Sequence, residues 1–497
     1  MDRLRRVGMT VTGIVGWFFA FGGGPAHADE TRDAFAGGVS LKTAYESLSL
    51  PGKEKMGFGE IGISKDIGES FNVGVDIWSA VRGNRGGFIT IGVDGGFHTP
   101  IVDGLELEGG AFVGAGGGRG GYTLSGGGLM LRAYGGLAFD MGSFGRLGAG
   151  VSYVDFPNSG SIHSTQPVVF YTVPLSFSGR TTKGSTGSST VRQHENSVAL
   201  VASELRVKSS ARTIKGAKQG DLKLVGITWR NYLDDNWYIK LEAEGAAGGS
   251  SSGYMQVLAG GGVRVPIAGG LYANADASVG GGGGGAVDTR GGLLLGASAG
   301  FQYFLTRDLY TGVSAGYLAA ARGSFRAFNP TLQLGYRFGG KDDANTNSVD
   351  EPIPLRVRVT SQTYLNGSTG WRSSYTDRNV DNLGVQFDYF VLPSLYLSGQ
   401  ALGAYNGQAG AYMVGLVGPG VRPNITEHFF FDAEALVGAA GGGGLAVGSG
   451  LVWQGNAGLG YQISKEVSLM VNYGRIGAFN GDLRAGVIGI SLGYGNR

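Results

Sequence analysis

A histidine next to a serine is the first pair in this sequence that could do chemistry. His163 and Ser164 occur together in the segment SIHS. A histidine that takes the proton of a serine hydroxyl activates the oxygen to attack an acyl ester. The sequence does not single out an acidic residue that would orient the histidine. Ordinary loop composition is the preferred interpretation of this pair, and ester cleavage is the alternative.

A second histidine, His98, lies in the segment GFHTPI, which matches GVRVPI and GVRPNI further along the chain. The histidine therefore corresponds to Arg264 and Arg422. A catalytic histidine is not interchangeable with arginine, which stays protonated and cannot act as a base. We expect a structural cationic or polar group at this position. His194 falls in a predicted linker and His428 in a predicted turn, so neither indicates a metal site.

Several carboxylates recur at matching places in the chain: Glu106, Glu108, Asp276, Asp432 and Glu434. As a functional site they could bind a cation or act as acid and base. The preferred interpretation is polar pairing with arginines such as Arg132 and Arg264. We predict no catalytic, metal-binding or cofactor-binding residue and no cofactor, and the sequence does not identify a binding residue.

Two glycine runs, at 114–121 and 280–285, superficially match the Gly-x-Gly-x-x-Gly pattern of dinucleotide-binding loops. That pattern needs a strand before the glycines and a helix after them. No helical periodicity follows either run. We expect the glycines to allow strand curvature, bulges or close packing of strand tips and loops.

The carboxylates and glycines belong to a unit of about 160 residues that occurs three times. Matching segments are 105–139, 271–303 and 429–461. In the last of these, Phe429 and Phe431 alternate with Asp432 and Glu434, which is the period of two of a β-strand. Each unit contains about eight such strands, and the first strand of the second unit is predicted at 202–215. An apolar face backed by an acidic face suits a wall between hydrocarbon and a polar interior.

Composition restricts the class of protein further. The 497 residues include 97 glycines, no cysteine and 16% charged residues, with a net charge of +2. Disordered chains carry more charge, and collagen has a triplet period that is absent here. Without a basic excess, a nucleic-acid partner is not expected. Without cysteine, disulfides and cysteine metal sites are excluded.

The first residues have the pattern of a signal peptide. Arg3, Arg5 and Arg6 precede a modestly apolar core, and AHA at 26–28 is a cleavage signal. We predict export, with cleavage after Ala28. No later stretch is a twenty-residue apolar helix, so a membrane-embedded mature chain would have to be a barrel.

The connections between predicted strands alternate between short turns, such as 268–270, and longer loops, such as 283–291. The last strand alternates Ile488, Ile490, Leu492 and Tyr494. This end resembles the C-terminal signature strand of bacterial outer-membrane β-barrel proteins, except that three residues follow the aromatic. The resemblance implies an integral outer-membrane protein of a Gram-negative bacterium with long loops outside. It also implies contact with outer-membrane lipids, including lipopolysaccharide, and with the barrel-assembly machinery.

Two polar segments favour three barrels over one wide barrel of about 24 strands. The predicted organisation is a signal peptide at 1–28, barrel repeats at 29–178, 201–339 and 355–497, and linkers at 179–200 and 340–354. An eight-stranded barrel has room only for packed side chains. The expected fold is thus all-β and antiparallel, with three homologous eight-stranded repeats.

The function expected from these features is a non-enzymatic membrane scaffold that presents glycine-rich surface loops. A porin-like passive channel or export pore formed by one wide barrel is the first alternative. A lipid-modifying hydrolase of the outer leaflet, centred on His163 and Ser164, is the second. The sequence does not identify an extracellular or envelope ligand.

Overall fold

The computed structural model describes residues 38–119, 124, 126–158, 160–175, 195–338 and 354–495. The predicted signal peptide and most of both predicted linkers lie outside these ranges. All of these described residues belong to one compact unit. Within the described part, regular structure is almost entirely β-strand, and none of the helices there is long and apolar enough to cross a membrane.

The described strands number 24. The first eight are β1 (Val39–Ser49), β2 (Lys55–Ile67), β3 (Phe71–Arg82), β4 (Ile89–Val102), β5 (Leu105–Gly116), β6 (Leu129–Asp140), β7 (Arg146–Asp155) and β8 (His163–Leu175). The next eight are β9 (Asn196–Val207), β10 (Leu222–Tyr232), β11 (Trp237–Gly249), β12 (Met255–Ala268), β13 (Leu271–Gly283), β14 (Leu293–Phe304), β15 (Leu309–Ala320) and β16 (Arg326–Phe338). The last eight are β17 (Leu355–Tyr364), β18 (Val380–Leu392), β19 (Leu395–Asn406), β20 (Met413–Val421), β21 (Phe429–Gly441), β22 (Leu451–Gln462), β23 (Val467–Ala478) and β24 (Arg484–Gly495). Short 3-10 turns occupy η1 (Pro51–Lys53) and η3 (Gly142–Phe144).

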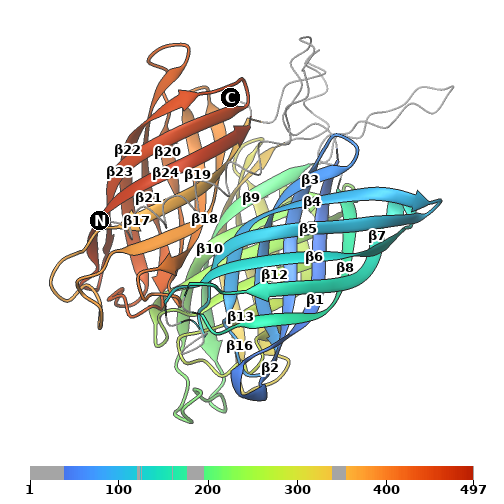
Figure 1. Cartoon of the computed structure of the whole chain (residues 1–497). Helices are drawn as coiled ribbons and strands as arrows, with labels where there is room; N and C mark the ends of the chain where they lie inside the picture. Colours follow the sequence, from blue (N-terminus) through green and yellow to red (C-terminus); the bar gives the residue numbers. More distant parts are fainter. Residues whose placement is uncertain are drawn as a thin grey trace. The chain divides into compact units, whose positions relative to one another are not determined.

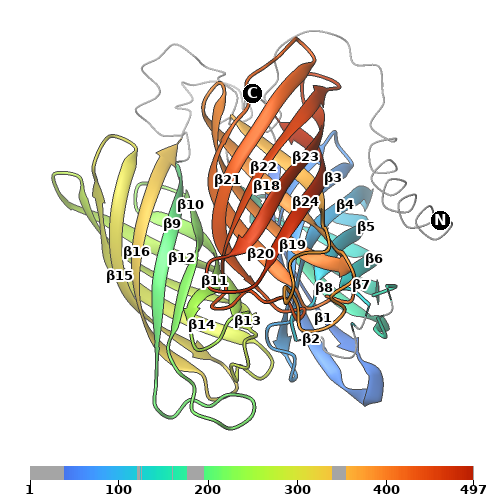
Figure 2. The ribbon, with the colours of Figure 1, turned by 90° about the vertical axis from the view of Figure 1, so that its left-hand side faces the viewer.

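Each group of eight strands closes into its own antiparallel barrel (Figures 1 and 2). The first strand pairs with the last strand of the same unit: β1 with β8, β9 with β16 and β17 with β24. In the third barrel, for example, Val359 lies opposite Leu492. The predicted all-β fold with three eight-stranded barrels is confirmed. The alternative of one wide barrel is wrong, because no unit leaves an edge strand open for its neighbour.

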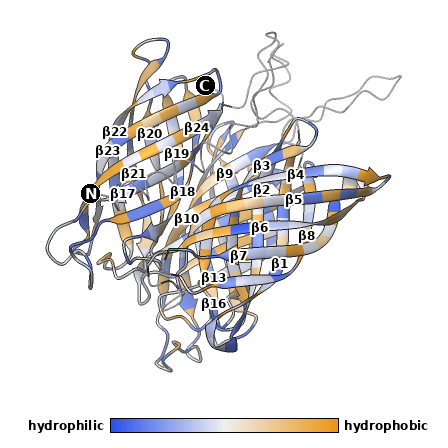
Figure 3. Cartoon of the chain, in the orientation of Figure 1, coloured by the Kyte–Doolittle hydropathy of each residue, from blue (hydrophilic) through white to orange (hydrophobic). Residues whose placement is uncertain are grey.

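The alternation in the sequence decides which side chains face outward. In β21, Phe429, Phe431 and Val437 are exposed on the outer wall, whereas Asp432 and Glu434 are buried inside the barrel. Figure 3 shows hydrophobic residues recurring along the strands of the walls. A one-residue shift in register would turn the carboxylates outward, so the strand register is strongly specified.

The start of the second barrel differs from the prediction. β9 begins at Asn196, within the segment predicted as a linker, and ends at Val207. The outward positions Val198 and Leu200 alternate with inward Ala199 and Val201, which is the strand pattern that the sequence prediction missed. Residues 208–215, predicted as strand, belong to the β9–β10 loop, whose basic and glycine residues lack alternation.

The connections define two rims in every barrel. We call the end with short connections, such as those at 103–104, 269–270 and 393–394, the short-turn rim. The opposite end, with connections such as 83–88, 208–221 and 365–379, is the long-loop rim. Each lumen has an apolar cluster toward the long-loop rim, which in the first barrel contains Phe58, Trp78 and Phe88. Charged side chains fill the rest, so the three interiors are packed bodies.

The glycine-rich strand ends lie where different barrels touch. A Cβ atom on Gly403 of β19 would lie 2.5 Å from the backbone of Ala115 on β5, and one on Gly441 would lie 2.2 Å from Gly253. A Cβ atom on Gly281 would lie 2.1 Å from Ser79. The strand pairs with the most extensive contact are β5 with β19, β3 with β13, and β11 with β21, and each of these three joins the third strand of one unit to the fifth of another. Side chains larger than hydrogen would prevent these approaches.

Candidate functional site: the charged barrel interiors

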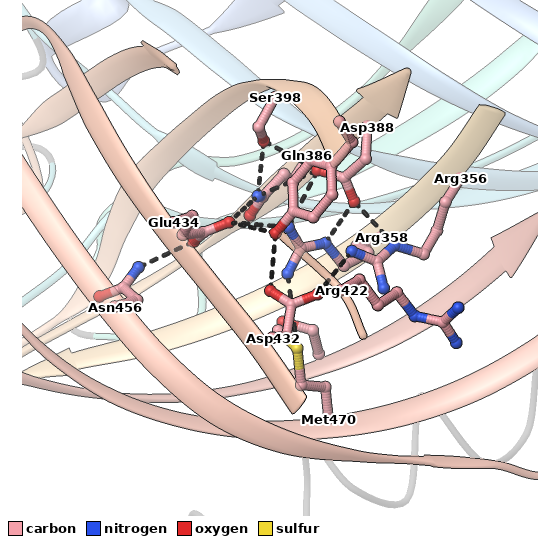
Figure 4. A network of polar contacts seen from close by, with 12 residues as sticks. Arg356, Arg358, Gln386, Asp388, Ser398, Arg422, Asp432, Glu434, Asn456 and Met470 are labelled. Carbon is pink, nitrogen blue, oxygen red and sulfur yellow. Dashed lines mark hydrogen bonds and ion pairs between the residues drawn. The ribbon is translucent and has the colours of Figure 1, made fainter. Parts of the chain in front are cut away.

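The third barrel contains a network of buried, paired charges (Figure 4). Arg358 donates two hydrogen bonds to Asp388, of 2.7 and 2.9 Å, and one of 2.9 Å to Glu434. Arg356 bridges Asp388 at 2.8 Å and Asp432 at 2.9 Å. Arg356 and Arg358 lie two residues apart on β17, so their side chains share one face of the strand. Both are buried, which places that face inside the barrel. The predicted carboxylates Asp432 and Glu434 thus pair with arginines that the sequence prediction had not named.

Neutral groups complete this site. Gln386 donates to Glu434 at 2.7 Å, Ser398 donates to Asp388 at 2.8 Å, and Asn456 donates to Glu434 at 2.9 Å. Buried charges keep their ionised form at tolerable cost only when partners of this kind satisfy them. The arrangement crosslinks β17, β18, β19, β21 and β22 across the lumen. The network therefore stabilises the third barrel and fills part of its lumen.

In the second barrel the predicted Asp276 is the centre of a smaller group. It accepts hydrogen bonds from Lys240 at 2.7 Å, Ser298 at 3.0 Å and Tyr238 at 3.1 Å. Lys240 also lies 3.4 Å from Glu242. These side chains come from β11, β13 and β14, which lie within four consecutive strands of the barrel wall.

The first barrel holds more carboxylates than cations. Lys42 donates to Asp94 and lies 3.7 Å from Asp76 and 3.8 Å from Glu60. Buried oxygens without a hydrogen-bond partner occur on several of these groups: Glu46, Glu60, Asp76, Asp94 and Glu108. Among the described residues, no cluster of three or more histidine or carboxylate side chains has the arrangement of a metal site.

The remaining predicted residues of the first barrel divide between its two ends. Glu108 accepts a hydrogen bond from Tyr134 at 3.1 Å, and Arg132 donates to Glu46 at 3.2 Å. Glu106 lies toward the short-turn rim, where Arg146 contacts it at 3.1 Å. Thus Glu106 and Glu108 have different partners, although the alternation places them on the same face.

The position shared by His98, Arg264 and Arg422 lies near the short-turn rim. His98 lies 3.4 Å from Glu106, and Arg264 donates to Glu195 at 3.0 Å. Arg422 donates to Gln462 at 2.7 Å. Arg264 and Arg422 also stack over aromatic rings, 3.8 and 3.7 Å from the centroids of Tyr232 and Phe430. Arg264 and Arg422 are thus cations that link side chains at this rim.

The pair considered for ester cleavage does not form a nucleophile and base. Adjacent residues of a strand point to opposite faces, and His163 and Ser164 open β8. His163 is exposed on the outer wall, where it lies 2.6 Å from Asp155. Ser164 is buried in the lumen and donates to Gln166 at 2.6 Å. The prediction that His163 belongs to a loop is also wrong, because it is the first residue of a strand.

Loops cover the lumen at the long-loop rim. In the third barrel, Trp371 and Arg372 of the β17–β18 loop are buried, and Arg372 donates to the carbonyls of Gly407 and Gln408 at 2.9 and 3.0 Å. Burial lowers the pKa of the Arg372 guanidinium, so those carbonyls offset a real loss of hydration. In the first barrel, Phe156 and Ile162 of the β7–β8 loop are fully buried.

The other rim of the third barrel is also nearly filled. A cavity there, lined by residues that include Arg356, Arg422 and Gln462, has a volume of about 10 Å³. That is room for about one water molecule. The charged interior is therefore tightly packed at this place.

The similarity of this chain to known proteins lies at the level of solved structures. No protein-family model matches the chain, and no curated protein matches it. The solved structures to which it is similar include bacterial outer-membrane β-barrels. A mutant of the ferric enterobactin receptor PfeA from Pseudomonas aeruginosa, in complex with enterobactin, shares 10% identity over 94% of this chain and 82% of its own, with a TM-score of 0.29.

Two further structures illustrate the range of sizes. OpdQ from Pseudomonas aeruginosa shares 11% identity over 92% of this chain and 96% of its own, with a TM-score of 0.21. A de novo designed transmembrane β-barrel shares 17% identity over 29% of this chain and 97% of its own, also with a TM-score of 0.21. Such low identities and scores do not transfer a ligand or an activity to this chain.

Proposed function

We propose that this protein is an integral outer-membrane protein that acts as a non-enzymatic scaffold of three closed barrels. Its long-loop rim, with the glycine-rich loops at 284–292 and 442–450, faces the cell exterior. The observation that carries the proposal is the outer wall. Large apolar side chains are exposed in all three barrels, among them Val151, Val169, Leu332, Leu334, Val471 and Ile490.

Such walls are unfavourable in water. A soluble monomer rarely exposes continuous apolar patches of more than a few hundred square ångströms. Here the exposed apolar positions alternate with buried polar ones, which is the reverse of a soluble barrel with a hydrophobic core. Aromatic residues near the short-turn rim, such as Phe139, Tyr303 and Tyr461, have the placement of an interfacial girdle.

The filled lumens favour a scaffold over a channel. Ion passage through an eight-stranded barrel would require displacement of groups such as Arg358 and Glu434 from their hydrogen bonds. The glycine runs have a role in contacts between barrels as well as the role in surface loops expected from the sequence. Their strand portions pack barrel against barrel, and among their loop glycines Gly442 and Gly444 are exposed.

Reconstitution of the purified full-length chain tests the proposal. We expect it to stay with membranes after alkaline extraction, to need detergent for solubility and to give no stepwise conductance in a planar bilayer. Solubility in plain buffer would refute the membrane assignment. Reproducible single-channel steps would refute the closed scaffold and revive a pore.

A further inference from the structure

We propose that the outer wall of the second barrel carries a binding site for the phosphate-bearing headgroup of a membrane lipid. The site consists of Arg206, Lys208 and Lys223, flanked by Tyr317 and Phe328, and we call it the basic wall patch. This inference rests on the proposed membrane location, and it adds a ligand class and a site.

The patch begins with an unusual concentration of charge. The segment at 206–223, RVKSSARTIKGAKQGDLK, contains six basic residues and one acidic residue, whereas the whole chain has a net charge of only +2. The corresponding β1–β2 and β17–β18 connections are far less basic. A feature confined to one of three homologous units is not required by the barrel fold itself.

Strand register places these cations on the outside of the barrel. On β9, Arg206 lies on the same face as Val198 and Leu200, both of which are exposed on the wall. Phe328 of β16 lies directly opposite Arg206, and Tyr317 of β15 lies opposite Phe328. Residues that face one another in antiparallel strands share a face. Tyr317, Phe328 and Arg206 therefore lie side by side on the outer wall, in one row across β15, β16 and β9.

The flanking cations complete the row. The Lys208 ammonium lies 5.3 Å from the centre of the Tyr317 ring. Lys223 of β10 lies opposite Glu204 on β9, which receives a hydrogen bond of 2.8 Å from Arg206. Glu204 orients Arg206, and Asp221 accepts a hydrogen bond of 2.8 Å from the backbone N–H of Val207. Three exposed cations thus face two carboxylates, which leaves an excess of positive charge. Both lysines and Arg206 are exposed.

The wall changes from apolar to basic along the strands. Toward the short-turn rim from this row, Leu200, Leu332 and Leu334 are exposed and form an apolar surface. Arg206 is six residues from Leu200, or about 20 Å along the strand. A lipid alongside the barrel has the same sequence of chemistries, with acyl chains below and an anionic headgroup above. Aromatic rings at the junction suit that boundary.

The alternative ligand is a soluble polyanion. The position of the basic wall patch on the side of the barrel argues against such a ligand. Such a ligand would approach from the extracellular side and contact the tips of the loops. Arg206 and Lys223 instead project sideways from strands, toward the surrounding lipid. Lysine and arginine near an anionic membrane surface are attracted electrostatically to the lipid headgroups.

The test compares retention of diphosphoryl lipid A by full-length variants in detergent, measured by native mass spectrometry. The triple variant Arg206→Gln, Lys208→Gln, Lys223→Gln removes the charges and should weaken retention by about tenfold or more. A matched control, Lys53→Gln with Lys55→Gln and Lys465→Gln, removes three exposed cations elsewhere and should leave retention unchanged. The charge-preserving variant Lys208→Arg with Lys223→Arg should also retain the lipid.

Two further measurements separate the explanations. Dephosphorylated lipid A should bind wild type and triple variant equally, and heat-dependent electrophoretic mobility should show that all variants are folded. Equal retention of diphosphoryl lipid A by the triple variant and the wild type would overturn the patch and leave the scaffold proposal intact. Loss of dextran sulfate binding without loss of lipid retention would overturn it in favour of a soluble polyanion. A wild-type chain that stays out of membranes would refute the scaffold proposal as well.

Discussion

Arg358 and Asp388 meet inside the third barrel through two parallel hydrogen bonds, of 2.7 and 2.9 Å, with both side chains removed from solvent. Such a fork-to-carboxylate contact fixes both distance and orientation. It joins β17, the first strand of the unit, to β18. The charged lumen is thus part of the means by which the barrel holds its shape.

Removal of the carboxylate should destabilise this barrel strongly. Asp388→Asn leaves Arg356 and Arg358 buried without a shared counter-charge, at a cost of about 3–5 kcal/mol. Urea titration of the folded protein, followed by heat-modifiable mobility, measures the change. Asp377→Asn, in an exposed loop, serves as the control. Equal midpoints for the two variants would contradict the structural role assigned to the pair.

The outer wall makes a prediction that separates lipid from water as the surrounding medium. Leu332 is 63% exposed near the middle of β16. If the wall faces a bilayer, Leu332→Arg should lower the free energy of unfolding by about 2–4 kcal/mol. If the wall faced water, the same substitution should change it by no more than about 0.5 kcal/mol. Ile214→Arg, in the β9–β10 loop, is the matched control, and folding stability in lipid vesicles is the measurement. An undiminished stability of Leu332→Arg would argue against a lipid-facing wall.

Glycine at the contacts between barrels makes a third prediction. Gly403→Ala would place a Cβ atom 2.5 Å from Ala115, while a Cβ atom on Gly135 would have nothing within 4 Å. Overpacking of this kind costs about 1–3 kcal/mol. We expect Gly403→Ala to loosen the contact between the first and third barrels and Gly135→Ala to leave it unchanged.

The absence of cysteine from the sequence provides a clean assay for this contact. Asn158 donates to Asn406 at 3.1 Å across the same pair of barrels. Cysteines at these two positions should crosslink readily in the wild-type background and more slowly with Gly403→Ala. Identical rates in the two backgrounds would show that glycine is not needed there.

Hydrolase activity makes the fourth prediction. Because His163 and Ser164 lie on opposite faces of β8, His163→Ala should change neither the acyl composition of cellular lipids nor, by more than about 0.5 kcal/mol, the stability of the protein. Mass spectrometry of extracted lipids checks the first expectation. A loss of one acyl chain in cells with the wild-type protein, absent with His163→Ala, would establish the enzyme after all.

Much of the fold follows from local alternation. The segments around Phe429 and Leu271 were recognisable as strands because one face is apolar and the other acidic, and the structure has β21 and β13 at those places. The failure at β9 has a physical cause. Glycine, serine and threonine in the preceding polar segment masked the short alternating run from Val198, and the basic loop after Val207 was mistaken for its continuation.

The interior partners could not be read from spacing alone. Asp432 was visible as an inward carboxylate, but Arg356 lies 76 positions away in the sequence, and only barrel closure brings the two together. A signal was present in the segment LRVRVT, where Arg356 and Arg358 occupy one face of a strand. The role of the glycine-rich strand ends was equally hidden, since the partners belong to different units.

Because every unit seals its last strand to its own first strand, assembly need not wait for the end of the chain. A nascent unit holds all the hydrogen-bonding partners that its edges require, so three successive insertions of modest size can replace one large one. Gene duplication in such a protein adds a finished membrane body and leaves the diameter of the existing ones unaltered.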